Sequence, residues 1–238
     1  MIVSTKAIVV STLKYGDTSL IVKCFTALSG IKTYLLKGVL TSKKGKIKAA
    51  YFQPLTLLEI VANHKDKGTM ELLKEVKISY PYQSIHSDIK KNALAFFLSE
   101  IINASIREEE TNTALFEYLE TSLQWLDTHP DVSNFHILFL LNLTKYFGFY
   151  PDDSNKHLSF FDLMEGEFTS QPSLNTITDG DLTLLKSFLG IKFDSLHMIK
   201  MTKTQRHTLI NLLITYFELH LLDFKKPRSL AVLNDVFN

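Results

Sequence analysis

Residues 6–36, KAIVVSTLKYGDTSLIVKCFTALSGIKTYLL, decide the fold of the first part of the chain. Apolar and β-branched residues fill three short runs in this stretch, and turn residues separate them at Gly16-Asp17 and Ser29-Gly30. Short runs of this composition, bounded by such turn residues, are typical of β-strands. The stretch therefore predicts three consecutive strands, over residues 6–15, 19–26 and 31–36.

Two further strands are expected before residue 80. Pro54 precedes the apolar run 55–61, which predicts a fourth strand. The run 69–78 fits a strand or a helix, and we interpret it as a fifth strand. Five short strands in about 75 residues predict a small closed or nearly closed β-barrel, and the OB-fold is the leading candidate.

The rest of the chain changes to helical spacing after Tyr80-Pro81-Tyr82. The nearly apolar segment 133–147 predicts the buried centre of a bundle that ends at Gly148. Residues 202–205 (TKTQ) form a capping box at the start of another helix. Helices are expected over residues 87–107, 112–127, 133–147, 179–189, 202 to about 222, and 229–237.

An irregular insertion at about residues 150–177 interrupts the helices. Within it, residues 157–170 (HLSFFDLMEGEFTS) read as two short strands joined by a turn at Glu165-Gly166. The expected fold class is therefore α+β and multidomain. An OB-fold barrel covers residues 1–80, and an α-helical domain over residues 81–238 carries the hairpin-like insertion.

Charge is divided unevenly along the chain, although the whole chain carries only +1. Residues 1–80 hold 13 lysines and five acids, a net charge of +8. Residues 81–238 hold 13 lysines or arginines and 20 acids, a net charge of −7. Because a basic domain attracts polyanions, the two domains are expected to have different partners.

Several classes of protein are excluded. No run approaches the roughly 20 apolar residues of a membrane-spanning helix, and the N-terminus shows no signal-peptide pattern. We therefore expect a cytoplasmic protein without a membrane partner. Cys24 is the only cysteine, which excludes an internal disulfide and a cysteine-rich zinc site.

Catalytic motifs are missing as well. The chain has no phosphate loop, no dinucleotide-binding glycine motif, no zinc-protease motif and no nucleophile elbow. Asp152, Asp153 and His157 could together hold a metal, but a solvated loop after Pro151 is the favoured interpretation. We therefore expect no enzymatic activity and no cofactor.

A lysine-rich stretch, residues 36–52 (LKGVLTSKKGKIKAAYF), follows the third predicted strand. It contains no acid, and Gly38 and Gly45 allow an irregular backbone. Lysines contact phosphates without reading bases, and neighbouring aromatic rings can stack on unpaired bases. The predicted DNA-binding residues are Lys37, Lys43, Lys44, Lys46 and Lys48, with Lys14, Lys32 and Tyr34 if their strands face the same way.

Several segments resemble the RecO family of bacterial DNA repair and recombination mediators. The likeness rests on residues 15–22 (YGDTSLIV), 36–38 (LKG), 52–55 (FQPL) and 148–151 (GFYP). The resemblance implies an N-terminal OB-fold that binds single- and double-stranded DNA, followed by a helical domain. It also implies a non-enzymatic mediator that anneals strands and, with RecR, helps RecA displace the single-stranded-DNA-binding protein (SSB). The resemblance also implies a contact with the acidic C-terminal tail of SSB.

One part of the family pattern is missing. Many members carry four cysteines in a zinc-binding hairpin after the segment that matches residues 148–151, but residues 152–172 contain none. Tetrahedral thiolate zinc is therefore excluded here. We expect burial of apolar side chains to hold the hairpin instead, through Leu158, Phe160, Phe161, Leu163 and Phe168.

Two other classes of function stay open at this point. The chain could be an adaptor whose helical domain grips an acidic peptide in an apolar groove, while the basic barrel only steers. The candidate residues for a basic rim are Lys203, Arg206, Lys225, Lys226 and Arg228. An enzyme acting on nucleic acid would need clustered acids for a divalent metal, and the basic half offers only isolated ones.

Overall fold

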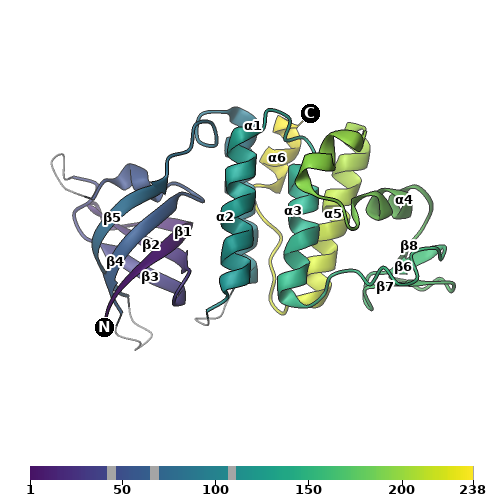
Figure 1. The fold of residues 1–238 in the computed structure, drawn as a ribbon, viewed down its shortest axis with the longest axis horizontal. Coiled ribbons are helices and arrows are strands. Elements are labelled where there is room, and N and C mark those ends of the chain that lie inside the picture. Colours follow the sequence, from purple (N-terminus) through teal and green to yellow (C-terminus); the bar gives the residue numbers. More distant parts are fainter. Residues whose placement is uncertain (42–46, 65–69, 107–110, 238) are drawn as a thin grey trace. The chain divides into compact units, whose positions relative to one another are not determined.

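The computed structural model describes residues 1–41, 47–64, 70–106 and 111–237. The chain forms two compact units (Figure 1). The first comprises Met1–Thr128 with Pro227–Ser229, and the second comprises His129–Lys226 with Leu230–Asn238.

The first unit is built on a five-stranded antiparallel sheet in the order β3-β2-β1-β4-β5. Its strands are β1 (Ile2–Tyr15), β2 (Ser19–Thr26), β3 (Gly30–Leu36), β4 (Leu57–Asn63) and β5 (Leu72–Tyr80). All five predicted strands are confirmed, including the one that also fitted a helix. A short 3-10 helix, Ala49–Phe52, precedes β4.

The two edges of this sheet meet at Glu71, just before β5. Glu71 forms a parallel bridge with Tyr34 of β3. The Glu71 N–H donates to the Thr33 carbonyl over 2.8 Å, and the Leu35 N–H donates to the Glu71 carbonyl over 3.3 Å. The edges touch here without forming a full ladder, which is the partly open barrel of an OB-fold. The predicted fold class is thereby confirmed.

The barrel interior is filled by residues that alternate along each strand. Ala7 and Val9 of β1 point inward together with Val22 and Cys24 of β2, and all four are buried. Burial raises the pKa of the Cys24 thiol to about 12, so the thiol stays protonated and acts as a small apolar side chain. The predicted role of Cys24 as a core residue is confirmed.

Helices α1 (Ile89–Ser105) and α2 (Thr113–Thr128) complete the first unit. They cover the outer face of β1 and β2, where Ile8, Val10 and Phe25 are buried. The rings of Phe25 and Phe116 lie 5.8 Å apart. The predicted boundary near residue 80 marks a change in composition and secondary structure, whereas the compact unit continues through α2.

A buried carboxylate fastens the connection between the barrel and α1. Asp127, near the end of α2, accepts backbone hydrogen bonds from Gln83, Ser84 and Ile85 over 2.8–3.1 Å. The Lys91 ammonium donates to the Asp127 carbonyl and to Ser84 Oγ, both over 2.7 Å. Residues that follow β5 are therefore held against α2 by charge-assisted hydrogen bonds.

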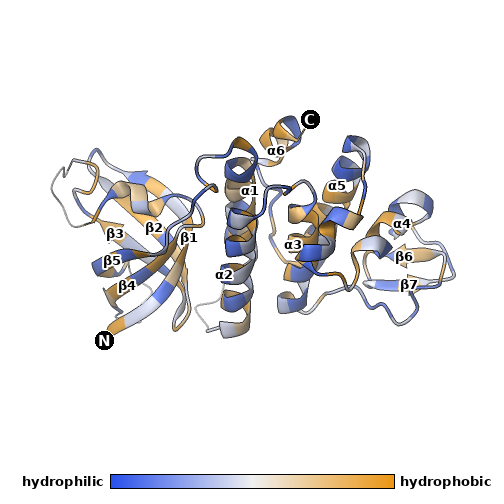
Figure 2. Cartoon of the chain, turned by 45° about the horizontal axis from the view of Figure 1, so that its top comes forward, coloured by the Kyte–Doolittle hydropathy of each residue, from blue (hydrophilic) through white to orange (hydrophobic). Residues whose placement is uncertain are grey.

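The second unit is mainly helical. Helix α3 (Phe135–Leu143) is buried along almost its whole length, as predicted, and it is followed by a 3-10 turn before Gly148, which has a φ of 81°. Figure 2 shows hydrophobic residues over much of this helix. The helices are α3 (Phe135–Leu143), α4 (Asp179–Phe188), α5 (Lys203–His220) and α6 (Leu230–Val236), with 3-10 turns at Thr144–Phe147 and Phe193–Met198.

A small sheet in the order β7-β6-β8 forms the insertion. Its strands are β6 (Phe160–Asp162), β7 (Glu167–Thr169) and β8 (Thr176–Ile177). The predicted hairpin and its turn are confirmed. Phe161, Leu163 and Phe168 are buried, whereas Leu158 and Phe160 are half-buried, so the first three residues carry most of the hairpin's apolar packing.

The described residues contain no helix that is long and apolar enough to cross a membrane. Nor do these ranges bring together three or more histidine, cysteine or acidic side chains in a metal-binding group. Asp152 instead accepts hydrogen bonds from the N–H and the hydroxyl of Ser154 over 2.9 and 2.6 Å. The hairpin strands therefore lack the donor set that thiolate zinc requires.

Candidate nucleic-acid interface

Three exposed lysines lie at one end of the barrel. In the strand register, Lys14 of β1 pairs with Leu20 of β2, and Leu20 pairs with Leu36 of β3. Lys37 follows directly, and the N–H of the next residue, Gly38, lies 3.4 Å from Ser19 Oγ. The last residues of β1, the first residues of β2 and the residues that follow β3 therefore lie together at one end of the barrel.

The chain returns to this end at Lys48. The Lys48 carbonyl accepts the Tyr51 N–H, which starts the 3-10 turn before β4. The Thr12 hydroxyl of β1 then donates to the Phe52 carbonyl over 2.8 Å. Lys14, Lys37 and Lys48 are all exposed and come from three segments that meet here. The predicted Lys43, Lys44 and Lys46 lie outside the described residues.

Lys32 and Tyr34 do not belong to this surface. Both lie on the inward row of β3 and pair with Cys24 and Val22. Lys32 is 7% exposed and Tyr34 is 1% exposed, and the Tyr34 hydroxyl lies 2.9 Å from His64 Nε2. Lys32 could contact phosphate, and Tyr34 could stack on bases, only if their side chains faced outward. Both side chains face the barrel interior instead, so the structure corrects their predicted place in the site.

The charge of the three lysines is not neutralised by neighbouring acids. Across the described ranges, Lys14, Lys37 and Lys48 take part in no ion pair. Other barrel lysines are engaged, since Lys6 lies 2.9 Å from Glu120 and Lys77 lies 2.7 Å from Glu59. The exposed Asp17 in the β1–β2 turn is the nearest acid in sequence to Lys14. Unpaired cations at one edge suit an extended polyanion.

Two exposed apolar residues at this end were missing from the predicted site. Leu13 is 65% exposed and Tyr15 is 53% exposed. Simple alternation along residues 6–15 does not identify them, because β1 carries a bulge between Val9 and Ser11 that exchanges its inward and outward rows. The resemblance of residues 15–22 to the RecO family is the one signal in the sequence that includes Tyr15.

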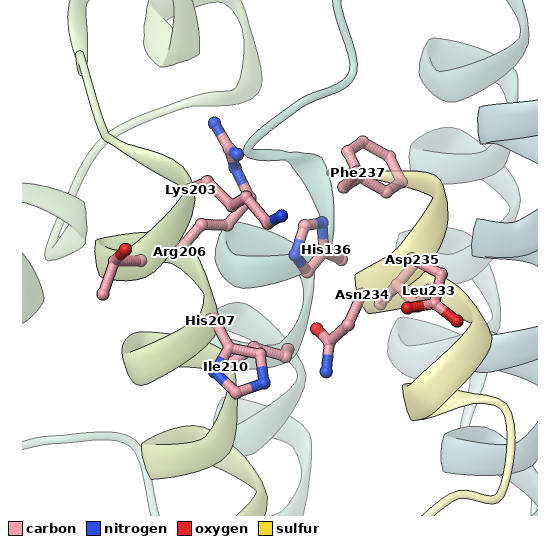
Figure 3. A pocket seen from close by; sticks show the side chains of 10 residues that line it. His136, Lys203, Arg206, His207, Ile210, Leu233, Asn234, Asp235 and Phe237 are labelled. Atoms are coloured by element: carbon pink, nitrogen blue, oxygen red, sulfur yellow. The ribbon is translucent and has the colours of Figure 1, made fainter.

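A separate pocket of about 350 Å³ lies in the second unit (Figure 3). Lys203 and Arg206 come from the first turn of α5, and His136 comes from α3. Apolar lining is contributed by Ile210, Leu233 and Phe237. Asn234 and Asp235 of α6 also line it, so the cations lie on the α5 side and the one carboxylate on the α6 side.

The electrostatics of this pocket are dominated by permanent cations. Burial, with the nearby Arg206, lowers the pKa of His136 to about 3, so His136 is neutral at physiological pH. The Arg206 Nε–H donates to Asn134 Oδ1 over 3.2 Å, which orients the guanidinium. Of the predicted basic rim, Lys203 and Arg206 line the pocket, whereas Lys225, Lys226 and Arg228 do not.

The fold is that of an OB-like barrel followed by a helical region with a small sheet, and family models identify it. Residues 1–82 match the model described as "Recombination protein O N terminal", and residues 86–230 match "Recombination protein O C terminal". The chain therefore belongs to the RecO family of DNA repair proteins, as the resemblance indicated.

Relatives of similar length support the assignment. Proteins named "DNA repair protein RecO" from Flavobacterium psychrophilum and Christiangramia forsetii are 49% and 51% identical over 238 residues, covering all of both chains. A protein of the same name from Bacteroides fragilis is 37% identical over 243 residues and is likewise covered completely.

Proposed function

We propose that this protein binds single- and double-stranded DNA through the lysine end of its barrel. The observation that carries the proposal is the convergence of Lys14, Lys37 and Lys48 at one end of an OB-like barrel, where all three are exposed and form no ion pair with any described residue. Lysine–phosphate contacts give affinity without base specificity. The expected binding is therefore strong at low salt and independent of sequence.

We propose that this DNA binding serves repair by recombination, in keeping with the RecO family to which the chain belongs. We propose that the protein anneals complementary strands and, together with RecR, helps RecA to load on SSB-coated DNA. Its role is stoichiometric binding rather than catalysis, and it acts in the cytoplasm at the nucleoid. A strand-annealing assay on SSB-coated DNA, with and without RecR, tests this function. Metal-dependent cleavage or ligation of the DNA would instead favour an enzyme.

The salt dependence of DNA binding tests the lysine end. Replacing Lys14, Lys37 and Lys48 together by Gln removes about three phosphate contacts. The log–log slope of single-strand affinity against salt should become shallower by about 2, because each contact contributes about 0.7. The Kd is measured by fluorescence anisotropy at several salt concentrations.

A matched control is available on the same barrel. Lys6, Lys74 and Lys77 are also exposed, and Lys6 and Lys77 already pair with Glu120 and Glu59. Their triple replacement by Gln changes the net charge equally and should leave most of the slope intact. If both triple variants flatten the slope to the same extent, binding depends on overall charge and the lysine end is not the site.

We propose that the pocket in the second unit receives the acidic C-terminal tail of SSB. The supporting observation is the combination of Lys203 and Arg206 with an apolar floor that includes Ile210 and Phe237. An acidic peptide with a terminal aromatic residue would bring carboxylates to the cations and a ring to the floor. We therefore propose one protein with both activities: it binds DNA through the barrel and binds SSB through this pocket, so the adaptor function is part of the mediator function.

Peptide binding tests this second site. Lys203→Ala and Arg206→Ala should each weaken the affinity for a labelled SSB tail peptide by about fivefold or more. Lys225→Ala and Lys226→Ala serve as controls, because they remove equal charge from outside the pocket. Tail binding that persists unchanged in the first two variants would place the tail elsewhere.

A further inference from the structure

We infer that Tyr15 is a stacking platform for unpaired bases, so that the lysine end binds single strands through base contacts as well as phosphate contacts. This inference rests on the proposed DNA binding and adds a residue and a strand preference to it. The occupant is a single-stranded nucleic acid.

The bulge in β1 places Leu13 and Tyr15 on the outside of the barrel. Past the bulge, Leu13 pairs with Ile21 and Tyr15 pairs with Ser19. The neighbours of Ile21 in β2, Leu20 and Val22, point into the core, so the row that contains Ile21 points outward. Leu35 of β3 extends the same row, because it pairs with Ile21.

This outer face is divided into a covered half and an open half. Toward the start of β1, the helices bury Ile8 and Val10. Lys23 of β2 reaches Asn103 of α1 over 2.9 Å, which extends the cover across the middle of the face. Beyond that point, Leu13 and Tyr15 are more than half exposed. Leu13 and Tyr15 lie in one outward row with Ile21 and Leu35, and a contiguous exposed apolar patch of this kind marks an interaction surface.

The charge at the edge of the open half identifies the kind of partner. Lys37 lies across β2 from Tyr15, because Tyr15 pairs with Ser19 and the Gly38 N–H donates to Ser19 Oγ over 3.4 Å. Lys14 pairs with the inward-facing Leu20, so it leaves β1 on the opposite face from Tyr15, at the same end of the barrel, which Lys48 also reaches. The ring of Tyr15 and the flat row beside it can contact the face of a base, while the lysines contact the backbone. An aromatic ring beside a cationic track is the arrangement that binds single strands without sequence preference.

Strand preference follows from geometry. In a duplex, the faces of the bases are stacked on each other and are closed to a side chain on a protein surface, whereas the phosphates stay accessible. Tyr15 can therefore contribute to binding of a single strand and not to binding of an intact duplex. The lysines contribute to both.

The experiment compares Tyr15→Ala with Tyr15→Phe in the full chain. Tyr15→Ala should weaken binding of an oligo-dT single strand by roughly tenfold, which is within the range for loss of one stacked base. Binding of a duplex of the same length should not change, and the salt slope should stay the same because no charge is removed. Tyr15→Phe should bind single strands like the unmodified protein.

An oligonucleotide that lacks bases isolates the stacking contact. The unmodified protein should bind oligo-dT more tightly than an abasic strand of equal length, and Tyr15→Ala should remove that difference. Phe96→Ala is the matched control, because Phe96 is an aromatic residue on α1 with 49% exposure, close to that of Tyr15. Phe96→Ala should change neither the affinity for oligo-dT nor the affinity for the abasic strand.

The outcomes separate this inference from the function on which it rests. If the unmodified protein binds neither DNA form, the proposed function fails. If it binds DNA but Tyr15→Ala weakens single strand and duplex equally, or neither, the stacking role is wrong and the proposed function stands. Loss of self-association in Tyr15→Ala with unchanged DNA affinity would assign the open face to a second copy of the chain and overturn the inference.

Discussion

At the scale of single residues, Asp127 shows how one residue can join three parts of a unit through its side chain and its backbone carbonyl. Its carboxylate accepts N–H groups from the segment that follows β5, and its own carbonyl accepts the Lys91 ammonium. Burial alone would raise the pKa of Asp127, but the backbone hydrogen bonds from Gln83, Ser84 and Ile85 outweigh it and hold the pKa below its usual value.

Replacing Asp127 should therefore destabilise the protein in a pH-dependent way. Asp127→Ala leaves buried N–H groups without an acceptor, and we expect a loss of about 3 kcal/mol in the free energy of unfolding at pH 7. A carboxyl with a lowered folded-state pKa stabilises above its unfolded pKa of about 3.9, and this contribution is lost as the pH falls through the folded-state value. The difference between the two proteins should thus shrink below about pH 4.

Urea denaturation from pH 7 down to the acid limit of folding measures this effect. Glu117→Ala is the control, since Glu117 is an exposed acid on the same helix. It should change stability by less than about 0.5 kcal/mol. A constant penalty for Asp127→Ala across the pH range would show that lost packing, rather than the ionised carboxylate, is responsible.

The residue scale is also where prediction from sequence is weakest. The acid-free lysine stretch predicts surface residues, and Lys37 and Lys48 are exposed, whereas their contact with DNA stays a prediction. Lys32 and Tyr34 are misplaced, since a strand's sequence does not say which of its two rows faces the core when both contain apolar residues. The outward orientation of Tyr15 could not be predicted for a related reason, because the composition of a strand does not reveal a bulge.

At the scale of elements, the helices and strands follow closely from local patterns. The capping box predicted at Thr202 is present, with hydrogen bonds in both directions between Thr202 and Gln205. The hairpin is present without cysteines, and its turn lies against α5, where His220 Nε2 is 2.9 Å from the Leu163 carbonyl. Its docking depends on tertiary contacts that local patterns do not show.

Gly166 tests how tightly the hairpin docks. Its φ is +72°, and a Cβ atom there would lie 2.7 Å from the Tyr216 hydroxyl oxygen. Tyr216 is buried, and its hydroxyl donates to the Phe149 carbonyl over 2.8 Å, so it is held in place. Gly166→Ala should therefore lower the unfolding free energy by about 3 kcal/mol, the sum of left-handed backbone strain and overpacking.

Gly148→Ala separates the two causes. Gly148 also has a positive φ, +81°, but a Cβ atom there would have no neighbour within 4 Å. Only the backbone strain applies, which is about 1–2 kcal/mol. Thermal and urea unfolding of both variants measure the difference. Equal losses would mean that the hairpin yields to the extra methyl group and that its docking is loose.

At the scale of the whole molecule, the change in charge near residue 80 and the division into compact units do not coincide. The sequence changes from basic and strand-rich to acidic and helical near residue 80. The first compact unit nevertheless includes α1 and α2, because the outer face of β1 needs their cover. Composition predicts where secondary structure changes, and the burial of Ile8, Val10 and Phe25 determines which segments depend on each other.

Fragments of the full chain should follow this dependence. Residues 1–82 alone would expose Ile8, Val10 and Phe25 to water and lose the Asp127 contacts with Gln83, Ser84 and Ile85. Uncovering three large apolar side chains costs roughly 1.5–3 kcal/mol each, which together approaches the whole stability of a small domain. Residues 1–128 keep both the helices and the carboxylate.

We therefore expect residues 1–128 to unfold cooperatively in urea with the spectroscopic signature of packed aromatic side chains. Residues 1–82 should bind a hydrophobic dye and show no cooperative transition. Asp127→Ala in the longer fragment provides an intermediate case, with the helical cover present and the hydrogen-bonded connection removed. A cooperatively folded 1–82 fragment would contradict this dependence, because the barrel would then be stable without the helices that bury its outer face.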